Sequence, residues 1–318
     1  HWQALRPCRP PKRLAALDEV EPGFKRQLAR VVGISRTSLY DRPAIQKHKD
    51  AQAIQELTAA HERHPLYGVR RLALYLGWSE NKTRRIRRLS GVTAAKPHKK
   101  YRSYSGKPEI AVPGNHLHTY ALFKDTARPQ DGMDYSPMTQ EANAWVQDFT
   151  YLRIRSGLYY LALVMDLTTR EVLSWKLGTT HSSQLTHIAL VQALRSNPSP
   201  SILHSDRGSE YLSERHQATC ARFGITLSAS RPGSPWQNGF MERCIKSIKE
   251  ELGPLANYQD IDELYVGVAN AISYYNNERI HLSLKMSPAA YAASLPTARS
   301  TNLKLRRSLR LVFGKRGA

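Results

Sequence analysis

Residues 144–154 read AWVQDFTYLRI, and the rest of the predicted catalytic domain is built around this stretch. Its aromatic and β-branched residues predict a strand. Asp148 lies in the middle of it, where aspartate is uncommon and therefore needs a functional reason. A turn at Gly157 separates this stretch from an apolar run at 158–167, and a second turn leads to residues 171–177. The pattern predicts three antiparallel strands at the start of a domain, with Asp148 on the first of them.

Two more carboxylates follow at positions that are typical of catalytic residues. Residues 200–205 predict a short buried strand that ends at Asp206, and the carboxyl end of a strand is a common place for a catalytic ligand. A helix is expected from 238 to about 252, with Glu242 in its first turns. Three converging carboxylates supply the hard oxygen ligands that Mg²⁺ prefers, and two ions about 3.5–4 Å apart can activate an attacking oxygen and stabilise a leaving oxygen. Asp148, Asp206 and Glu242 are therefore predicted as catalytic residues and metal ligands.

The charge of the chain is large and uneven. Its 318 residues include 47 Lys and Arg against 26 Asp and Glu, a net charge of +21. Residues 1–110 hold 24 basic and 9 acidic side chains, residues 111–295 hold 16 and 17, and residues 296–318 hold 7 and none. A neutral body with two basic flanks is typical of a protein that binds nucleic acid. The 3 cysteines do not form a disulfide framework, and no apolar run approaches the roughly 18 residues of a membrane span, so no membrane partner is expected.

Residues 24–40 predict a first helix-turn-helix unit. The stretch reads FKRQLARVVGISRTSLY, in which Gly33 breaks an apolar helical face and Ser35 can cap a second helix. The first turn of that second helix is where major-groove readers place their base contacts. An ordinary helical hairpin is the alternative. The DNA contacts predicted in this unit are Arg36, Thr37 and Ser38.

Residues 51–89 predict a second helical unit of the same kind. Helices are expected at 51–63, from 67 through 76 and at 81–89, with Ser79 as the cap of the last one. The cations of that last helix repel one another unless phosphates lie opposite. A solvated charged face is the alternative. The DNA contacts predicted here are Arg70, Arg71, Lys82, Arg84, Arg85, Arg87 and Arg88.

The stretch 96–143 is rich in Pro, Gly and His and shows little periodicity. It is interpreted as a basic linker with an insertion at about 125–140. Lys99 and Lys100 are its predicted contacts to a nucleic-acid backbone. The predicted plan of the chain is a helix-turn-helix unit at 1–48, a second one at 49–95, the linker at 96–143, a catalytic core at 144–258, the C-terminal helical part of that core at 259–295 and a basic tail at 296–318.

Four motifs stand out in the second half of the chain. They are Trp145-x-x-Asp148-x-Thr150-Tyr151, His204-Ser205-Asp206-Arg207-Gly208-Ser209-x-Tyr211, Ser234-Pro235-x-x-Asn238-x-x-x-Glu242 with Lys249 seven residues later, and Tyr275-Asn276-x-x-Arg279-x-His281. Together they resemble the integrase core and C-terminal signature of DDE transposases, most closely those of the IS-three family of bacterial insertion sequences. The resemblance implies an α/β fold with a ribonuclease-H-like mixed-sheet core, preceded by small all-α helix-turn-helix units.

The resemblance also implies roles for these residues. Asp148, Asp206 and Glu242 would hold two Mg²⁺ ions, for which Mn²⁺ can substitute, and Lys249 would contact the terminal bases or backbone of the element. Helix geometry supports the last role independently, because Glu242, Lys246 and Lys249 follow i, i+4, i+7 spacing on one face. The further DNA contacts predicted in this half of the chain are Asn238, Lys246, Arg279 and His281.

The function expected from these features is that of a transposase. It would bind the terminal inverted repeats of its element as a homo-oligomer, at least a dimer, and cleave and join double-stranded DNA with Mg²⁺. It would act in the bacterial cytoplasm, at the nucleoid. One alternative is a catalytically idle DNA-binding regulator, which is expected to have lost a carboxylate. Others are a metal-dependent nuclease of the same fold, which would not need two DNA-binding units, and a basic ribosomal or scaffold protein, which would not need three carboxylates.

Overall fold

The computed structural model describes residues 42–94, 113–117, 122–123, 133–134, 144–230 and 235–295. The chain divides into two compact units, residues 1–95 and 96–318. Among the described residues, no helix is both long and apolar enough to cross a membrane. The predicted features that lie outside the described residues are the first helix-turn-helix with Arg36, Thr37 and Ser38, the pair Lys99 and Lys100, and the basic tail.

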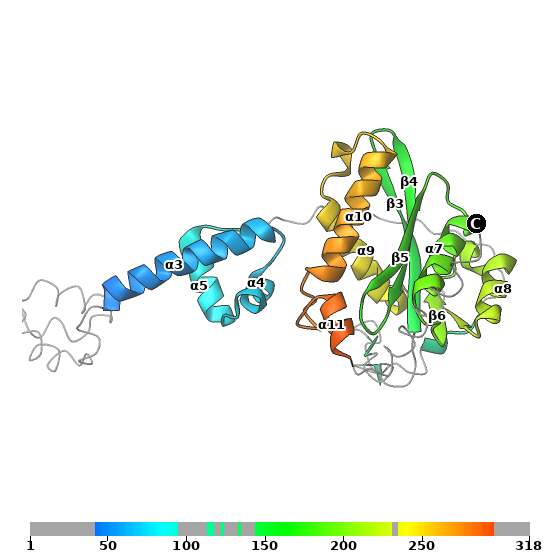
Figure 1. Cartoon of the computed structure of the whole chain (residues 1–318), viewed down its shortest axis with the longest axis horizontal. Helices are drawn as coiled ribbons and strands as arrows, with labels where there is room; N and C mark the ends of the chain where they lie inside the picture. Colours follow the sequence, from blue (N-terminus) through cyan, green and yellow to red (C-terminus); the bar gives the residue numbers. More distant parts are fainter. Residues whose placement is uncertain are drawn as a thin grey trace, which may run out of the picture. The chain divides into compact units, whose positions relative to one another are not determined.

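The first unit contains the helices α3 (Arg42–Arg63), α4 (Val69–Leu76) and α5 (Glu80–Ser90) (Figure 1). Ser79 caps α5 as predicted, because its side-chain oxygen accepts the backbone N–H of Lys82 (3.2 Å). The three helices found here are those expected for the second helix-turn-helix.

The start of α3 differs from the expectation. The apolar period begins near residue 51, but α3 begins at Arg42 and includes Pro43 in its first turn, where the missing N–H of proline costs no helical hydrogen bond. Leu57 of α3 and Ile86 of α5 are fully buried and hold the two helices together. The boundary expected between residues 48 and 49 therefore falls inside a continuous helix.

The second unit is built on a five-stranded sheet in the order β5-β4-β3-β6-β7. Its strands are β3 (Ala144–Ile154), β4 (Gly157–Asp166), β5 (Val172–Gly178), β6 (Ile202–Ser205) and β7 (Thr226–Ala229). The first three pair antiparallel, as predicted, whereas β6 pairs parallel with β3 and β7 pairs parallel with β6. This strand order and mixture of directions is the ribonuclease-H-like arrangement, so the predicted fold class is confirmed.

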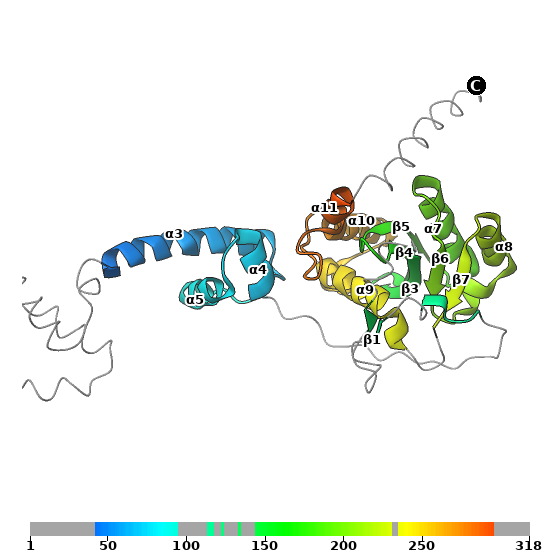
Figure 2. The same cartoon turned by 90° about the horizontal axis from the view of Figure 1, so that it is seen from below.

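Helices and short 3₁₀ turns make up most of the remaining structure. They are α7 (Ser183–Ser196), η5 (Ser209–Leu212), α8 (Glu214–Arg222), η6 (Pro235–Asn238), α9 (Gly239–Leu252), η7 (Leu255–Asn257), α10 (Ile261–Asn277) and α11 (Pro288–Ser294). One face of the sheet buries Trp145 and Leu203 beneath α7 and α8, and the other buries Val146 beneath α9 and α10 (Figure 2). Trp145 and Val146 belong to different layers because alternate residues of a strand point to opposite faces.

Asn276 ties α10 to the edge of the sheet. Its Oδ1 accepts the backbone N–H of Val172 and its Nδ2 donates to the C=O of the same residue, both at 2.9 Å. Val172 begins β5, which is an edge strand of the sheet. The side chain thus satisfies backbone groups that no neighbouring strand reaches, which gives this part of the C-terminal signature a structural role.

Part of the predicted linker packs into the core. The backbone C=O of Gly114 accepts the N–H of Ala229 at the end of β7 (3.2 Å), and Leu117 is 1% exposed. Further along, β1 (Leu122–Phe123) and β2 (Met133–Asp134) pair antiparallel. Residues 113–117 are held by individual long-range contacts and not by a long helix or a strand. Their sequence therefore shows no regular period.

A buried histidine lies on the opposite side of the strand that carries Asp148. Gln147 precedes Asp148 on β3, and its Nε2 lies 2.9 Å from Nε2 of His216 on α8. Both side chains are buried, and burial lowers the pKa of His216 to about 4. Because the amide nitrogen can only donate, the imidazole must accept at Nε2 and must therefore be neutral.

We expect this histidine to make the protein sensitive to acid. Its folded-state pKa of about 4 lies below the model-peptide value of 6.5, so the unfolded state binds the extra proton between these pH values and stability falls as the pH drops through them. At about 1.4 kcal/mol per pH unit, the loss at pH 4 is about 3 kcal/mol. Urea unfolding at pH 7 and pH 4 should show a smaller acid loss for His216→Gln than for the wild type. Equal losses in the two proteins would contradict this.

Candidate active site

The three predicted carboxylates lie on neighbouring elements. Val146 of β3 is the parallel partner of His204 of β6, so Asp148 and Asp206 each follow two residues later at matching positions. Residues two apart on a strand share a face, and Val146 faces α9. Glu242 lies in the first turn of that helix. The register of two strands and the helix that covers them therefore bring the three side chains to one region.

These carboxylates affect one another electrostatically. Burial raises the pKa of Asp148 well above its usual range, and the charges of Asp206, Glu242 and Glu210 raise it further. The backbone N–H of Phe149 donates to Asp148 Oδ1 (2.8 Å), which acts in the opposite direction. Burial also raises the pKa of Glu242. A positive charge placed among these groups would relieve both the repulsion and the cost of burial.

The donor chemistry fits a divalent cation. Carboxylate oxygens are hard ligands, and the repulsion around Asp148 favours a cation among them. Within the described residues, no three or more His, Cys, Asp or Glu side chains lie closely enough to enclose a metal ion. Mg²⁺ does not need such an enclosure, because it keeps several waters and binds through one or two carboxylates together with substrate phosphates. The open arrangement therefore suits an ion that is shared with a substrate.

Asp206 is oriented by the turn that follows it. The backbone N–H of Gly208 donates to Asp206 Oδ1 (2.9 Å). A Cβ atom at Gly208 would overlap the carboxylate of Glu210, which would then have to move. Upstream, the ring of His204 is fully buried between the hydroxyls of Ser228 (2.9 Å) and Ser230 (3.0 Å), and burial lowers its pKa to about 4. Hydrogen bonds therefore fix the chain both before and after Asp206.

The two predicted lysines of α9 have different surroundings. Lys249 Nζ lies 5.0 Å from the ring centroid of Tyr151 on β3. Burial lowers the pKa of Lys249, while the Asp148 carboxylate acts in the opposite direction, which shows that the two charges interact. Lys246 is more exposed and pairs with Glu250 (3.7 Å). Only Lys249 of this pair is therefore directed toward the carboxylates.

The sequence did not identify Glu210, a further carboxylate whose charge acts on Asp148. Glu210 is buried and lies 3.5 Å from His181 Nε2, and the His181 ring packs on Phe149 with centroids 4.1 Å apart. The Tyr211 hydroxyl is buried without a partner among the described residues. Glu210 could have been identified from its position four residues after Asp206, in the turn that orients the Asp206 carboxylate.

Asn238 has a buried amide without partners. It is 4% exposed, and neither its Nδ2 nor its Oδ1 makes a hydrogen bond among the described residues. It lies one helical turn before Glu242. An unsatisfied buried amide costs about 1–3 kcal/mol, so this side chain favours a partner that is not among the described residues.

The predicted DNA contacts of the first unit lie on α4 and α5. Arg85 is paired to Asp50 of α3 through two bonds of 2.6 and 2.8 Å, and Arg84 is paired to Glu80 (2.6 Å). Arg88 is exposed near the end of α5. The remaining contacts of this set are Arg70 near Glu80 (3.8 Å), Arg71 near the Tyr67 ring (5.9 Å), Lys82 over the Trp78 ring (3.8 Å) and Arg87, which donates to the C=O of Val92 (3.0 Å).

The two predicted contacts from the C-terminal signature lie elsewhere. Arg279 is 5% exposed, and its Nε lies 3.2 Å from Glu251 Oε1 at the end of α9. The structure therefore places it in the core, where it joins α9 to the chain after α10. His281 pairs through its backbone with Met286, and its Nδ1 lies 2.9 Å from the Ser283 hydroxyl.

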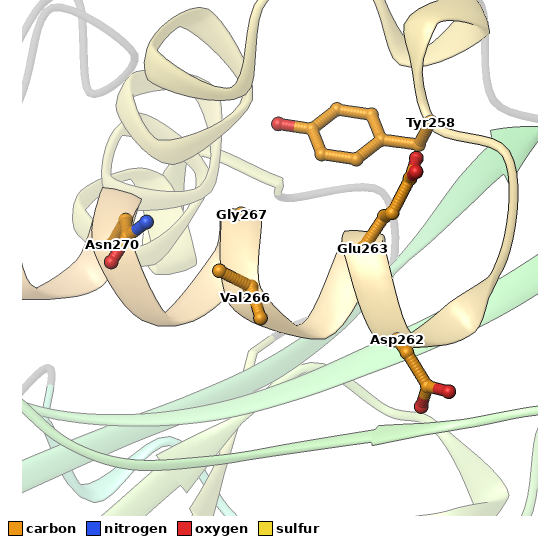
Figure 3. Close-up of a pocket in the computed structure, with 6 residues that line it drawn as sticks. All are labelled: Tyr258, Asp262, Glu263, Val266, Gly267 and Asn270. Carbon is orange, nitrogen blue, oxygen red and sulfur yellow. The ribbon is translucent and has the colours of Figure 1, made fainter.

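A pocket on α10 is separate from the carboxylates. Figure 3 shows the Tyr258 ring lying along the helix at Gly267, where a Cβ atom would collide with it. None of the three predicted metal ligands contributes to this pocket. Its lining residues are Tyr258, Asp262, Glu263, Val266, Gly267 and Asn270.

The fold and the carboxylates together define a class of enzyme. Acidic side chains that converge from a strand, from the end of its neighbour and from a covering helix suit the paired metal ions used by nucleases and polymerases for phosphoryl transfer. The family described as Integrase core domain matches residues 139–235, and a second model with the same description matches residues 223–288.

Individual relatives narrow the class. The chain is 31% identical over 241 residues to the putative transposase InsK for insertion sequence element IS150 of Escherichia coli K12, which covers 73% of this chain and 79% of that protein. It is 29% identical over 255 residues to the transposase for insertion sequence element IS904 of Lactococcus lactis, covering 77% and 95%. It is 38% identical over 109 residues to the transposase InsF for insertion sequence IS3A of Escherichia coli K12, covering 34% and 38%. The chain belongs to the integrase-core transposases of bacterial insertion sequences, the family predicted from its motifs.

This membership makes the chain an enzyme of phosphoryl transfer on DNA. The predicted family, fold class and transposase function are confirmed. The roles of individual residues, the metal and the assembly stay predictions.

Proposed function

We propose that this transposase binds the terminal inverted repeats of its element, cleaves a DNA strand there and joins the freed 3′ end to target DNA. Asp148, Asp206 and Glu242 would hold two Mg²⁺ ions, with Mn²⁺ as a substitute. The observation that carries the proposal is the placement of Asp148 on β3 and of Asp206 directly after the parallel neighbour β6, beneath the helix of Glu242. When bound, such cations supply activation of the attacking oxygen and stabilisation of the leaving oxygen.

The neighbouring side chains hold and orient the DNA. Lys249 is partly buried and interacts with the charge of Asp148, so it can hold the phosphate next to the one that reacts. The buried amide of Asn238, which makes no hydrogen bond among the described residues, can pair with the end of the DNA strand. The 3′ hydroxyl freed by cleavage then attacks a second phosphodiester, so a single site serves both reactions.

The basic helices supply binding to double-stranded DNA. α5 presents several cations on a short helix with a capped N-terminus, which is the geometry of a major-groove reader. The resemblance to insertion-sequence transposases implies a homo-oligomer on DNA, so the proposed assembly is at least a dimer. The site of action is the nucleoid in the bacterial cytoplasm.

The first prediction concerns the three carboxylates. Asp148→Asn, Asp206→Asn and Glu242→Gln should each lower cleavage and joining of end DNA with Mg²⁺ by more than about 100-fold, because loss of even an outer-shell partner of a metal costs 10–100-fold. Binding to end DNA should stay within about twofold. The exposed Asp262→Asn is the control.

The same variants separate chemistry from folding. Removing one charge from this set should leave the metal-free protein at least as stable as the wild type, because the charges of Asp206 and Glu242 act unfavourably on Asp148. Unfolding in EDTA tests this. Wild-type joining by any of the three variants would remove that residue from the site.

The second prediction compares the two lysines of α9. Lys249→Met should slow cleavage by about 10-fold or more, since a charge-assisted hydrogen bond contributes about 1.5–3 kcal/mol. Lys246→Met should stay within about twofold, because Lys246 is exposed and pairs with Glu250. Single-turnover cleavage at saturating DNA measures both. Equal effects of the two substitutions would contradict the orientation of Lys249 toward the reacting phosphate.

The third prediction separates two arginines of α5. Arg88→Gln should lower the slope of log affinity against log salt by about 0.9, the value for one phosphate contact. Arg85→Gln should mainly lower the stability of the first unit, because it breaks the two bonds to Asp50. Binding titrations at several salt concentrations and urea unfolding provide the measurements. An unchanged slope for Arg88→Gln would mean that this end of α5 faces solvent.

A further inference from the structure

We infer that residues 113–117, called the strap below, position the strand end of Asp206 and the helix of Glu242 relative to each other. The strap lies in the stretch that the sequence indicates is a linker; residues 113–115 are irregular, and residues 116–117 form a 3₁₀ turn. Its hydrogen bonds reach Ser228 of β7, the neighbour of β6, and Gln237 of η6, which precedes α9, and both residues are more than 100 positions away. The inference rests on the proposed metal-dependent function, because it concerns the geometry of two of the proposed ligands.

One set of contacts leads from the strap to Asp206. The backbone N–H groups of His116 and Leu117 donate to Ser228 Oγ, at 2.9 and 3.3 Å. Since that oxygen already accepts two hydrogen bonds, its own hydroxyl proton is directed to His204 Nδ1 (2.9 Å).

The chain of hydrogen bonds continues in the same direction. With Nδ1 accepting, the neutral ring of His204 carries its proton on Nε2 and donates to Ser230 Oγ (3.0 Å). Ser230 Oγ in turn lies 3.5 Å from the C=O of Ser205, the residue before Asp206. The backbone of the strap is therefore connected to the end of β6 through three buried side chains.

The second set of contacts leads from the strap to α9. Asn115 Nδ2 donates to Gln237 Oε1 (2.7 Å). Gln237 is 4% exposed and lies in η6, the turn that leads directly into α9, five residues before Glu242. This hydrogen bond joins the strap to the start of the helix that carries the third carboxylate.

The strap itself is fixed to the core independently of Asn115. Gly114 C=O accepts the N–H of Ala229 (3.2 Å), and Leu117 is buried in the cluster that includes Met241 of α9. A change at Asn115 should therefore leave the strap in place and alter its connection to Gln237. This makes a precise test possible.

The consequence is a positioning role for Asn115 and Gln237. Asp206 and Glu242 lie on elements that are distant in sequence, so their separation depends on contacts across the fold. A displacement of about 1 Å can cost an enzyme roughly 100-fold in rate. Neither amide needs to touch DNA or metal to have this effect.

The test is a reciprocal swap of the two amides. Asn115→Gln makes the combined reach of the pair one methylene too long, and Gln237→Asn makes it one too short. The double variant N115Q/Q237N restores the total length. The exposed Asn270→Gln is the matched control for an added methylene.

Two readouts are measured on the full chain, one of which does not depend on activity. We expect each single variant to bind Mn²⁺ at least about threefold more weakly, as followed by the paramagnetic signal of the free ion, and to cleave end DNA at least about 10-fold more slowly. Binding to end DNA and the unfolding temperature should stay near wild type. The double variant should recover Mn²⁺ binding and cleavage to within about threefold, and Asn270→Gln should change neither.

Other results would overturn the inference. Wild-type values for both single variants would show that the contact does not position the carboxylates. Losses of Mn²⁺ binding and cleavage that accompany a fall in unfolding temperature would assign the pair an ordinary packing role. A double variant that is no better than the single variants would do the same. An inactive wild type that binds no Mn²⁺ would instead contradict the proposed function, so the two failures are distinguishable.

Discussion

The parallel register between β3 and β6 is the constraint on which the rest of this structure depends. It pairs Val146 with His204 and so places Asp148 and Asp206 at matching positions two residues further on. A shift of one residue would turn one of these side chains to the opposite face of the sheet. It would also move Trp145 and Val146 out of the layers that bury them. Packing on both faces of the sheet therefore determines where the carboxylates lie.

This arrangement is costly in the absence of a cation. Asp148 is half-buried, and both its desolvation and the neighbouring carboxylates raise its pKa, so its negative charge is unfavourable there. Burial of apolar side chains from the same elements offsets this cost. α9 buries Met241, Ile245 and Ile248 against the sheet while its N-terminal turn carries Glu242. The core thus holds the site in a conformation that its own charges oppose, and DNA and metal ions would relieve that opposition.

Several of these features could be predicted from sequence because their causes are local. Asp148 stood out because aspartate is uncommon within a strand, and Ser79 because a capping residue precedes a helical period. Features that depend on distant partners were not predictable. Arg279 resembled a DNA contact, but Glu251 neutralises it inside the core. The strap resembled a linker because its partners, Ser228 and Gln237, lie more than 100 residues away.

The central claim is that three carboxylates on β3, after β6 and on α9 share divalent cations. The most direct measurement is an anomalous difference map from crystals of the wild type grown with Mn²⁺. The account predicts anomalous peaks bounded by the side chains of Asp148, Asp206 and Glu242. Well-ordered carboxylates with no peak among them, or Mn²⁺ bound only at other residues, would contradict it.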